Sequence, residues 1–252
     1  MTKVDYDPIA SRYNRRYELH AYPGIRATLR DIASSIPQPR VLEVGCGTGE
    51  WLAELASIGC DVVAGIDASE KMLELARTKV SADLRHGAAE SLPWSDGSFD
   101  LVLCVNSLHH FSSPSAALRE AFRVLRPAGQ FLSIGLDPHE SGGRWYVYEF
   151  FPRSLAIDRE RFASKSQRLR WLRSAGFQNI RVKAADRLEL SASFDEAIHD
   201  GVLEQAFTSQ LAALSASEYS AGLAQIRQHA REEGFRLYTE LTLYATSGER
   251  LG

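Results

Sequence analysis

The sequence predicts an α/β domain built on a doubly wound, mostly parallel sheet, and three observations carry that prediction. A buried-strand pattern at 41–44 runs directly into the glycine-rich turn GCGTG at 45–49, and a helix pattern follows at once. Strand and helix patterns then alternate as far as residue 136, which is typical of parallel strands joined by right-handed crossovers. The stretch 99–105 is continuously apolar, as expected of a strand buried on both faces of such a sheet.

The elements of this first half follow in order. A helix pattern at 8–20 is broken by Pro23 and Gly24, and a second helix with apolar positions from Ile25 to Ile36 is stopped by prolines. Later helices carry apolar stripes at 52–56, 72–76 and 118–125, and Ser69 is suited to cap the middle one. We expect strands at 40–44, 61–66, 82–86, 99–105 and 130–136.

After residue 136 the alternation lapses. An aromatic cluster at 145–151 indicates an excursion from the sheet, and we then expect a helix at 167–175 and a strand at 177–184. Two further helices are predicted, one with apolar positions from Phe194 to Phe207 and one from Tyr219 to Ala230. Ser215 and Glu218 have the spacing of a capping box for the latter. With a final strand at 235–246 and no internal repeat, the sequence predicts one domain over 1–252.

The composition is that of an ordinary globular protein. With 44% hydrophobic and 24% charged residues, the 252-residue chain can bury a sizeable core, and its net charge of −3 argues against wholesale binding to nucleic acid or a membrane surface. Charge is uneven, because residues 144–187 hold nine Arg and two Lys against four acids. The three cysteines have neither disulfide nor metal spacing, so we expect no metal. No run is long enough to span a membrane, and a cytoplasmic location is expected.

The glycine turn and two carboxylates point to a nucleotide-like ligand. Alternate glycines let the backbone approach a ligand closely at the carboxyl edge of the sheet. Asp67 ends the second predicted strand, where it can accept hydrogen bonds from ribose hydroxyls, although it can also help to cap the next helix. Glu43 lies inside an apolar strand, and a buried carboxylate needs a cationic partner such as a ligand's amino group.

Four motifs together resemble the class I S-adenosylmethionine-dependent methyltransferases, in particular the small-molecule group of the ubiquinone and menaquinone biosynthesis type. They are VLEVGCGTG at 41–49, GIDASEKML at 65–73, GAAESLPW at 87–94 with SFDLV at 98–102, and VLRPAG at 124–129. The matched block covers about 40–136. The resemblance implies a Rossmann-like seven-stranded sheet with an antiparallel last strand, N-terminal helices and helical or aromatic lid insertions. It also implies S-adenosylmethionine as cofactor, S-adenosylhomocysteine as product, and a small-molecule acceptor carrying an O, N or C nucleophile.

The same resemblance assigns roles to individual positions. Glu43 would lie near the cofactor's ammonium group, Asp67 would hold the ribose, and Asn106 would lie beside the methionine moiety. The glycines and the residues expected around the adenine are Gly45, Gly47, Gly49, Ala68, Met72, Ala89 and Glu90. Met72 also lies on the core stripe of its helix, so packing explains it equally well. Ala88 stands where relatives commonly have Asp, which removes one expected contact to the adenine.

The N-terminal aromatics and two histidines complete the candidate site. Tyr6 and Tyr13 lie where relatives carry aromatic residues on a helix that closes over the cofactor, although plain helix packing explains them as well. His109 and His110 follow the fourth predicted strand, at the reactive end of the cofactor, and are the candidate general bases. Histidines fixed to backbone carbonyls at a helix start are the alternative.

The acceptor is expected to lie under two lid segments, at about 137–164 and 193–233. The aromatic cluster at 145–151 covers the pocket in this interpretation, and a small satellite core is the alternative. The basic stretch 159–173 is expected to be a solvated helix face, unless the acceptor is acidic or phosphorylated.

Three other functions compete with this interpretation. A nicotinamide-dependent oxidoreductase would place its third glycine later, as in G-x-G-x-x-G. A tRNA or other nucleic-acid methyltransferase is kept open by the basic region. A non-catalytic protein that retains the cofactor fold is indicated by Ala88 alone. The sequence leaves the oligomeric state open.

Overall fold

A single eight-stranded sheet runs through the computed structural model, which describes residues 14–140 and 143–252. Its strands are β1 Arg40–Val44, β2 Val62–Asp67, β3 Asp83–His86, β4 Phe99–Val105, β5 Leu125–Gly135, β6 Arg144–Trp145, β7 Gln178–Ala192 and β8 Leu237–Glu249. The order is β3-β2-β1-β4-β5-β8, and both β7 and the short β6 pair with β8. Strands β1 to β5 are parallel, whereas all pairings of β8 are antiparallel. The predicted fold class, with its antiparallel last strand, is confirmed.

Helices cover both faces of this sheet. They are α2 Arg15–Leu19, α3 Pro23–Ser34, α4 Glu50–Ser57, α5 Glu70–Lys79, α6 Pro114–Val124, α7 Tyr146–Phe150, α8 Pro152–Arg161, α9 Lys165–Ala175, α10 Phe194–His199, α11 Ser209–Ala212 and α12 Ala216–His229, with a 3-10 helix η2 at Leu108–His110. Because alternate strand residues point to opposite faces, Val41 and Leu101 pack with α3 and α4, whereas Leu42 and Val102 pack with α6 and α9.

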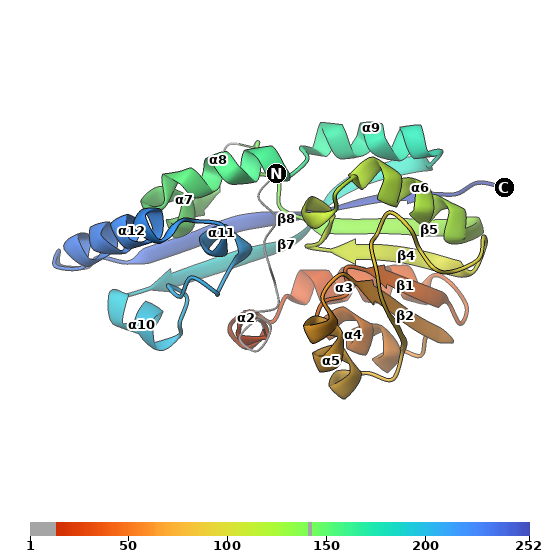
Figure 1. Cartoon of the computed structure of the whole chain (residues 1–252), viewed down its shortest axis with the longest axis horizontal. Helices are drawn as coiled ribbons and strands as arrows, with labels where there is room; N and C mark the ends of the chain where they lie inside the picture. Colours follow the sequence, from red (N-terminus) through yellow and green to blue (C-terminus); the bar gives the residue numbers. More distant parts are fainter. Residues whose placement is uncertain (1–13, 141–142) are drawn as a thin grey trace.

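Strands β7 and β8 extend far beyond the parallel sheet. In Figure 1 this two-stranded ribbon runs away from β1–β5, and α7, α8, α10, α11 and α12 surround it. The two strands pair as far as Ala192 opposite Leu237. The predicted strand at 177–184 was therefore too short, and the predicted final strand at 235–246 is shifted to Leu237–Glu249. Strand pairing decides both ends, because an isolated strand pattern does not reveal its partner.

The predicted helix from Phe194 to Phe207 was wrong. Helix α10 ends at His199, and Gly201 has a φ of +69°, a left-handed conformation that ends a helix readily when the residue is glycine. Turns follow until the short α11. The capping box of α12 is confirmed, since Ser215 accepts from the Glu218 backbone N–H and the Glu218 carboxylate accepts from that of Ser215.

The region expected to lack periodicity contains β6, α7 and α8. Its basic continuation is not simply a solvated helix face, because Arg161 and Arg168 are only 8% and 4% exposed. Within 14–140 and 143–252, no helix is long and apolar enough to cross a membrane. Tyr6 and Tyr13 lie outside the described residues, and only α2 is seen of the helix predicted at 8–20.

Candidate active site

The glycine turn after β1 lies at the carboxyl edge of the sheet, and its three glycines have different reasons to be there. All have positive φ, at +73° for Gly45, +51° for Gly47 and +76° for Gly49. A Cβ on Gly45 would lie 2.5 Å from Ser107 Cβ, and one on Gly49 would lie 3.0 Å from Ala76 Cβ. A Cβ on Gly47 would meet none of the described residues within 4 Å. Packing therefore requires two of the glycines, whereas Gly47 borders space that residues 14–140 and 143–252 leave open.

Asp67 holds this turn in place from the end of β2. Its Oδ2 accepts from the Gly47 backbone N–H at 2.8 Å, and its Oδ1 accepts from the Ser69 N–H at 2.9 Å. Burial raises the pKa of the Asp67 carboxyl, and the backbone donors oppose that shift. Each carboxylate oxygen has a further lone pair for a ligand hydroxyl. Asp67 thus helps to position the start of α5, because it accepts from the backbone N–H of the N-cap residue Ser69. This hydrogen bond does not prevent Asp67 from also accepting from a ribose hydroxyl.

Glu43 is the most costly residue of the site. It is 1% exposed, and neither carboxylate oxygen has a hydrogen-bond partner among the described residues. Burial raises its pKa well above the ordinary value, and the negative charges of Asp67 and Glu50 raise it further. A buried carboxylate left in this state is expensive unless a cation is supplied. The residues of this turn therefore fit a ligand that carries an ammonium group.

The residues expected around the adenine occupy different environments. Ala68 is exposed, whereas Ala89 and Met72 are buried at 7% and 2% exposure, and Met72 belongs to the buried side of α5. The Glu90 Oε1 accepts from the Ser113 backbone N–H at 2.8 Å, which places a carboxylate at the start of α6. Packing and capping already account for Met72 and Glu90 in the protein alone.

Asn106 connects the turn to a cavity beside it. It follows β4 with a φ of +51°, and its N–H donates to the Ile134 carbonyl at 2.8 Å. The neighbouring Ser107 hydroxyl donates to the Val44 carbonyl at 2.8 Å, so the ends of β1 and β4 are tied together. Asn106 also lines a cavity that opens at this edge of the sheet, called the larger cavity below because a smaller one lies next to it.

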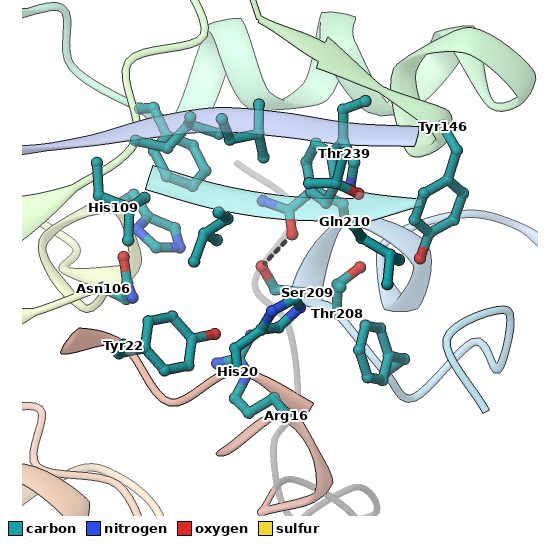
Figure 2. A pocket seen from close by; sticks show the side chains of 18 of the residues that line it. Arg16, His20, Tyr22, Asn106, His109, Tyr146, Thr208, Ser209, Gln210 and Thr239 are labelled. Atoms are coloured by element: carbon teal, nitrogen blue, oxygen red, sulfur yellow. Dashed lines mark hydrogen bonds between the residues drawn. The ribbon is translucent and has the colours of Figure 1, made fainter. Parts of the chain in front are cut away.

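The cavity that Asn106 lines has about as many polar as apolar side chains in its wall. Figure 2 shows Asn106 and His109 at one end, Tyr146 and Thr239 at the other, and Arg16, His20 and Tyr22 along one side. The apolar and aromatic lining consists of Leu136, Trp145, Tyr146, Phe162, Leu188, Leu190, Phe207, Leu241 and Leu243. A pocket of this composition is typical of small-molecule sites.

Both segments expected to act as a lid contribute side chains to this cavity. Trp145, Tyr146 and Phe162 come from the first, and Phe207 to Gln210 from the second. The leucines of β7 and β8 were missed by the sequence analysis, although Leu188 and Leu190 alternate with charged residues in a strand-like pattern. His20 lines the cavity as well.

The two histidines of η2 are held neutral. The His109 ring stacks on Phe162 at a centroid distance of 3.7 Å and an interplanar angle of 15°. Burial lowers the pKa of His109 well below its ordinary value, and nearby positive charge on Arg161 contributes. Burial, with Arg161 and Arg16, lowers the pKa of His110 to about 3. At neutral pH both rings therefore present one hydrogen-bond donor and one acceptor each.

Comparison with known proteins agrees with this geometry. The family model described as methyltransferase domain matches residues 42–133. A demethylmenaquinone methyltransferase of Staphylococcus epidermidis is 26% identical over 219 residues, or 83% of this chain and 89% of that protein. A ubiquinone biosynthesis O-methyltransferase of Hahella chejuensis is 33% identical over 169 residues, or 62% of this chain and 70% of that protein.

The fold is also found among solved structures. An S-adenosylmethionine-dependent methyltransferase of Thermotoga maritima superposes with a TM-score of 0.62 at 20% identity and covers 97% of both chains. A likeness at this identity concerns the fold. The family model and the sequence relatives remove the nicotinamide-dependent alternative, and transfer of a methyl group from S-adenosylmethionine to a small molecule is the activity of this enzyme. The chain belongs to the class I S-adenosylmethionine-dependent methyltransferases.

Proposed function

We propose that the methyl acceptor is an aromatic phenol or quinol that binds in the cavity beside Asn106. The observation that carries this proposal is the cavity lining, in which leucines and aromatic rings lie beside hydrogen-bonding side chains such as Asn106, Thr239 and Gln210. The names of the relatives support it, since one is a demethylmenaquinone methyltransferase and the other is a ubiquinone biosynthesis O-methyltransferase. A flat aromatic ring gains most from such walls, because it buries a large apolar area and stacks on other rings.

We propose that the turn residues hold the cofactor as the family pattern implies. Gly47 supplies the close approach, Asp67 accepts from the ribose, and Glu43 lies near the cofactor's ammonium group, whose positive charge would stabilise the ionised carboxylate. Asn106 borders the methionine end, while Ala68, Met72, Ala89 and Glu90 surround the adenine. When bound, S-adenosylmethionine supplies the methyl group from its sulfonium centre. The chain's own task is then alignment and exclusion of water, worth roughly 7–11 kcal/mol of barrier in well-oriented reactions.

His110 and His109 are proposed to face the acceptor hydroxyl. A neutral imidazole can accept a hydrogen bond from a phenol and so orient its oxygen. A pKa of about 3 for His110 means that this ring holds a proton poorly at neutral pH. The proposed role is therefore orientation of the hydroxyl and brief acceptance of its proton, which suits an acceptor that is itself fairly acidic.

The test is a comparison of acceptors with the purified enzyme and S-adenosylmethionine. Naphthoquinol and catechol are offered beside an aniline and an alkyl amine, and methylated products are identified by mass spectrometry. Methylation of the quinol or catechol, with the amines untouched, is expected. Methylation of the amines alone would refute the aromatic-hydroxyl proposal while leaving the methyltransferase assignment intact.

Two substitutions in β7 connect the activity to this cavity. Leu190→Gln places a polar group in the apolar wall, so the acceptor KM should rise about tenfold while cofactor affinity is unchanged. Glu189→Gln, at the exposed neighbouring position, is the matched control and should alter neither value. Equal effects of both substitutions would show that the acceptor does not use this wall.

We also infer a cytoplasmic location. Cys46, Cys60 and Cys104 are all free, and two of them are buried, as is usual in a reducing compartment. Fractionation of the producing cell, with recovery of the enzyme alongside periplasmic or secreted markers, would contradict this inference.

A further inference from the structure

A second, smaller cavity lies behind the first. Residues from η2, the start of α6, the end of β5, α8 and α9 line it, and its volume is about 20 Å³, room for one or two water-sized groups. His109, Leu136 and Phe162 line both cavities, so a single layer of side chains separates them. Nothing in the proposed methyl transfer uses this space.

Two buried arginines reach this small cavity. Arg161, at the end of α8, is 8% exposed, and Arg168, in α9, is 4% exposed. Arg161 Nε and Nη1 and Arg168 Nε and Nη2 have no hydrogen-bond partner among the described residues. Buried guanidinium N–H groups almost always donate a hydrogen bond, because a charged donor that is removed from water without a partner costs free energy. Four such nitrogens around one cavity therefore require an explanation.

The neighbouring acids do not provide it. Asp158 accepts from Arg161 Nη2 at 2.7 Å, but it also accepts from the Tyr148 hydroxyl at 2.7 Å and from Gln210 Nε2 at 2.9 Å. Asp137 Oδ2 is 4.0 Å from Arg168 Nη2, beyond hydrogen-bond distance, and the Asp137 carboxylate accepts from the backbone N–H groups of His139 and Lys165. Asp158 and Asp137 therefore partly offset the charges of the two arginines, but they leave these four donors without a hydrogen bond among the described residues.

We propose that this cavity is a binding site for a small monovalent anion held between Arg161 and Arg168. The volume suits a chloride ion or the oxygens of one carboxylate group and is small for sulfate or phosphate. Guanidinium groups are weakly hydrated and match a carboxylate in geometry. Two sources offer this chemistry: a free halide from solution, or a carboxylate borne by an acceptor whose ring lies in the larger cavity. The site itself does not depend on the proposed acceptor.

The first experiment uses chloride as the probe. The ³⁵Cl line width of sodium chloride is measured with the enzyme–S-adenosylhomocysteine complex in a sodium gluconate background. Excess broadening is expected for the native protein and for Arg173→Met, the matched control at an exposed position of the same helix. Arg168→Met should weaken chloride binding at least tenfold. No excess broadening, or equal broadening in Arg168→Met, would overturn the proposal and leave water as the occupant.

A second measurement applies where Arg168→Met fails to fold. Crystals of the native complex soaked in bromide should give an anomalous peak between the two guanidinium groups, and formate should displace it while sulfate does not. Absence of the peak at this position would likewise overturn the site.

The source of the anion is distinguished by a pair of ring compounds. If an acceptor carboxylate occupies the site, 4-hydroxybenzoate should bind at least tenfold more tightly than phenol, narrow the ³⁵Cl line, and lose both effects in Arg168→Met. If a free anion occupies it, both compounds should leave the chloride line unchanged. Both experiments measure binding and not methyl transfer. A failure of the anion site can therefore be distinguished from a failure of the proposed acceptor chemistry.

Discussion

Substitution of Gly47 by alanine should separate the stability of the glycine turn from its role in ligand binding. The φ of +51° costs an L-residue about 1–2 kcal/mol. No steric cost is expected from the described residues, because none of them has an atom within 4 Å of the new Cβ. For a chain of this length the loss corresponds to a fall in melting temperature of about 2–8 °C. The Cβ would, however, project into the space proposed for the cofactor.

The matched control is Gly59→Ala. Gly59 follows α4 at a φ of +85°, is exposed, and also has nothing within 4 Å of an added Cβ. Its backbone penalty should therefore resemble that of Gly47→Ala. Gly45→Ala is the opposite case, because its Cβ would lie 2.5 Å from Ser107 Cβ, and it should destabilise the fold much more than either.

The assay combines thermal unfolding of the cofactor-free variants with calorimetric titration of S-adenosylhomocysteine. Gly47→Ala and Gly59→Ala should lose similar stability, but only Gly47→Ala should lose affinity, by tenfold or more, which is at least about 1.4 kcal/mol. Native affinity in Gly47→Ala would refute the reasoning, because the open space beside this glycine would then not be the cofactor's.

Further predictions concern buried charge and packing. Because burial raises the pKa of Glu43 in the folded protein well above its usual value, the native protein loses stability as the pH rises through that folded pKa. Cofactor-free Glu43→Gln should therefore melt at a higher temperature than the native protein at pH 8 and at the same temperature at pH 4. Equal melting temperatures of the two proteins at both pH values would contradict this. The depressed pKa of His110, about 3, means that the unfolded state takes up a proton between pH 6.5 and 3 that the folded state refuses. Urea titrations give the free energy of unfolding at pH 7 and pH 5. Between these pH values His110→Gln should lose about 1–2 kcal/mol less of it than the native protein does, and equal losses would count against a neutral buried ring. Gly222→Ala would bring a Cβ within 2.2 Å of Phe151 Cδ1, so the packing of α12 on α7 should weaken by about 1–3 kcal/mol, and an unchanged melting temperature would show that the helices can separate freely.

The cofactor half was predictable because its determinants are local. The turn at 45–49, Asp67 and Asn106 each follow a strand directly, and parallel strands bring their carboxyl ends to one edge of the sheet. The sequence could not show why each glycine is needed. Gly45 is required because a Cβ there would clash with Ser107, and Gly49 because a Cβ would crowd Ala76, and both of these neighbours are distant in the chain.

The acceptor half was predicted only as two lid segments, because its main wall comes from strand pairing. Leu188 and Leu190 become cavity residues only because β7 continues to Ala192 opposite β8. Periodicity indicates that a segment is extended, but it does not identify the partner that keeps it so. The helix expected at 194–207 failed for a related reason, since its apolar spacing ignored the left-handed Gly201.

The basic stretch 159–173 was expected to be a solvated helix face, and two of its arginines are buried instead. Most positively charged helix residues are exposed, so a solvated face is the natural expectation. Arg170 and Arg173 meet it, whereas Arg161 and Arg168 turn inward to the small cavity. Their burial next to acids that already accept other hydrogen bonds is the basis of the proposed anion site. That burial is a property of three-dimensional packing, and it places the proposed site outside every motif that identifies the family.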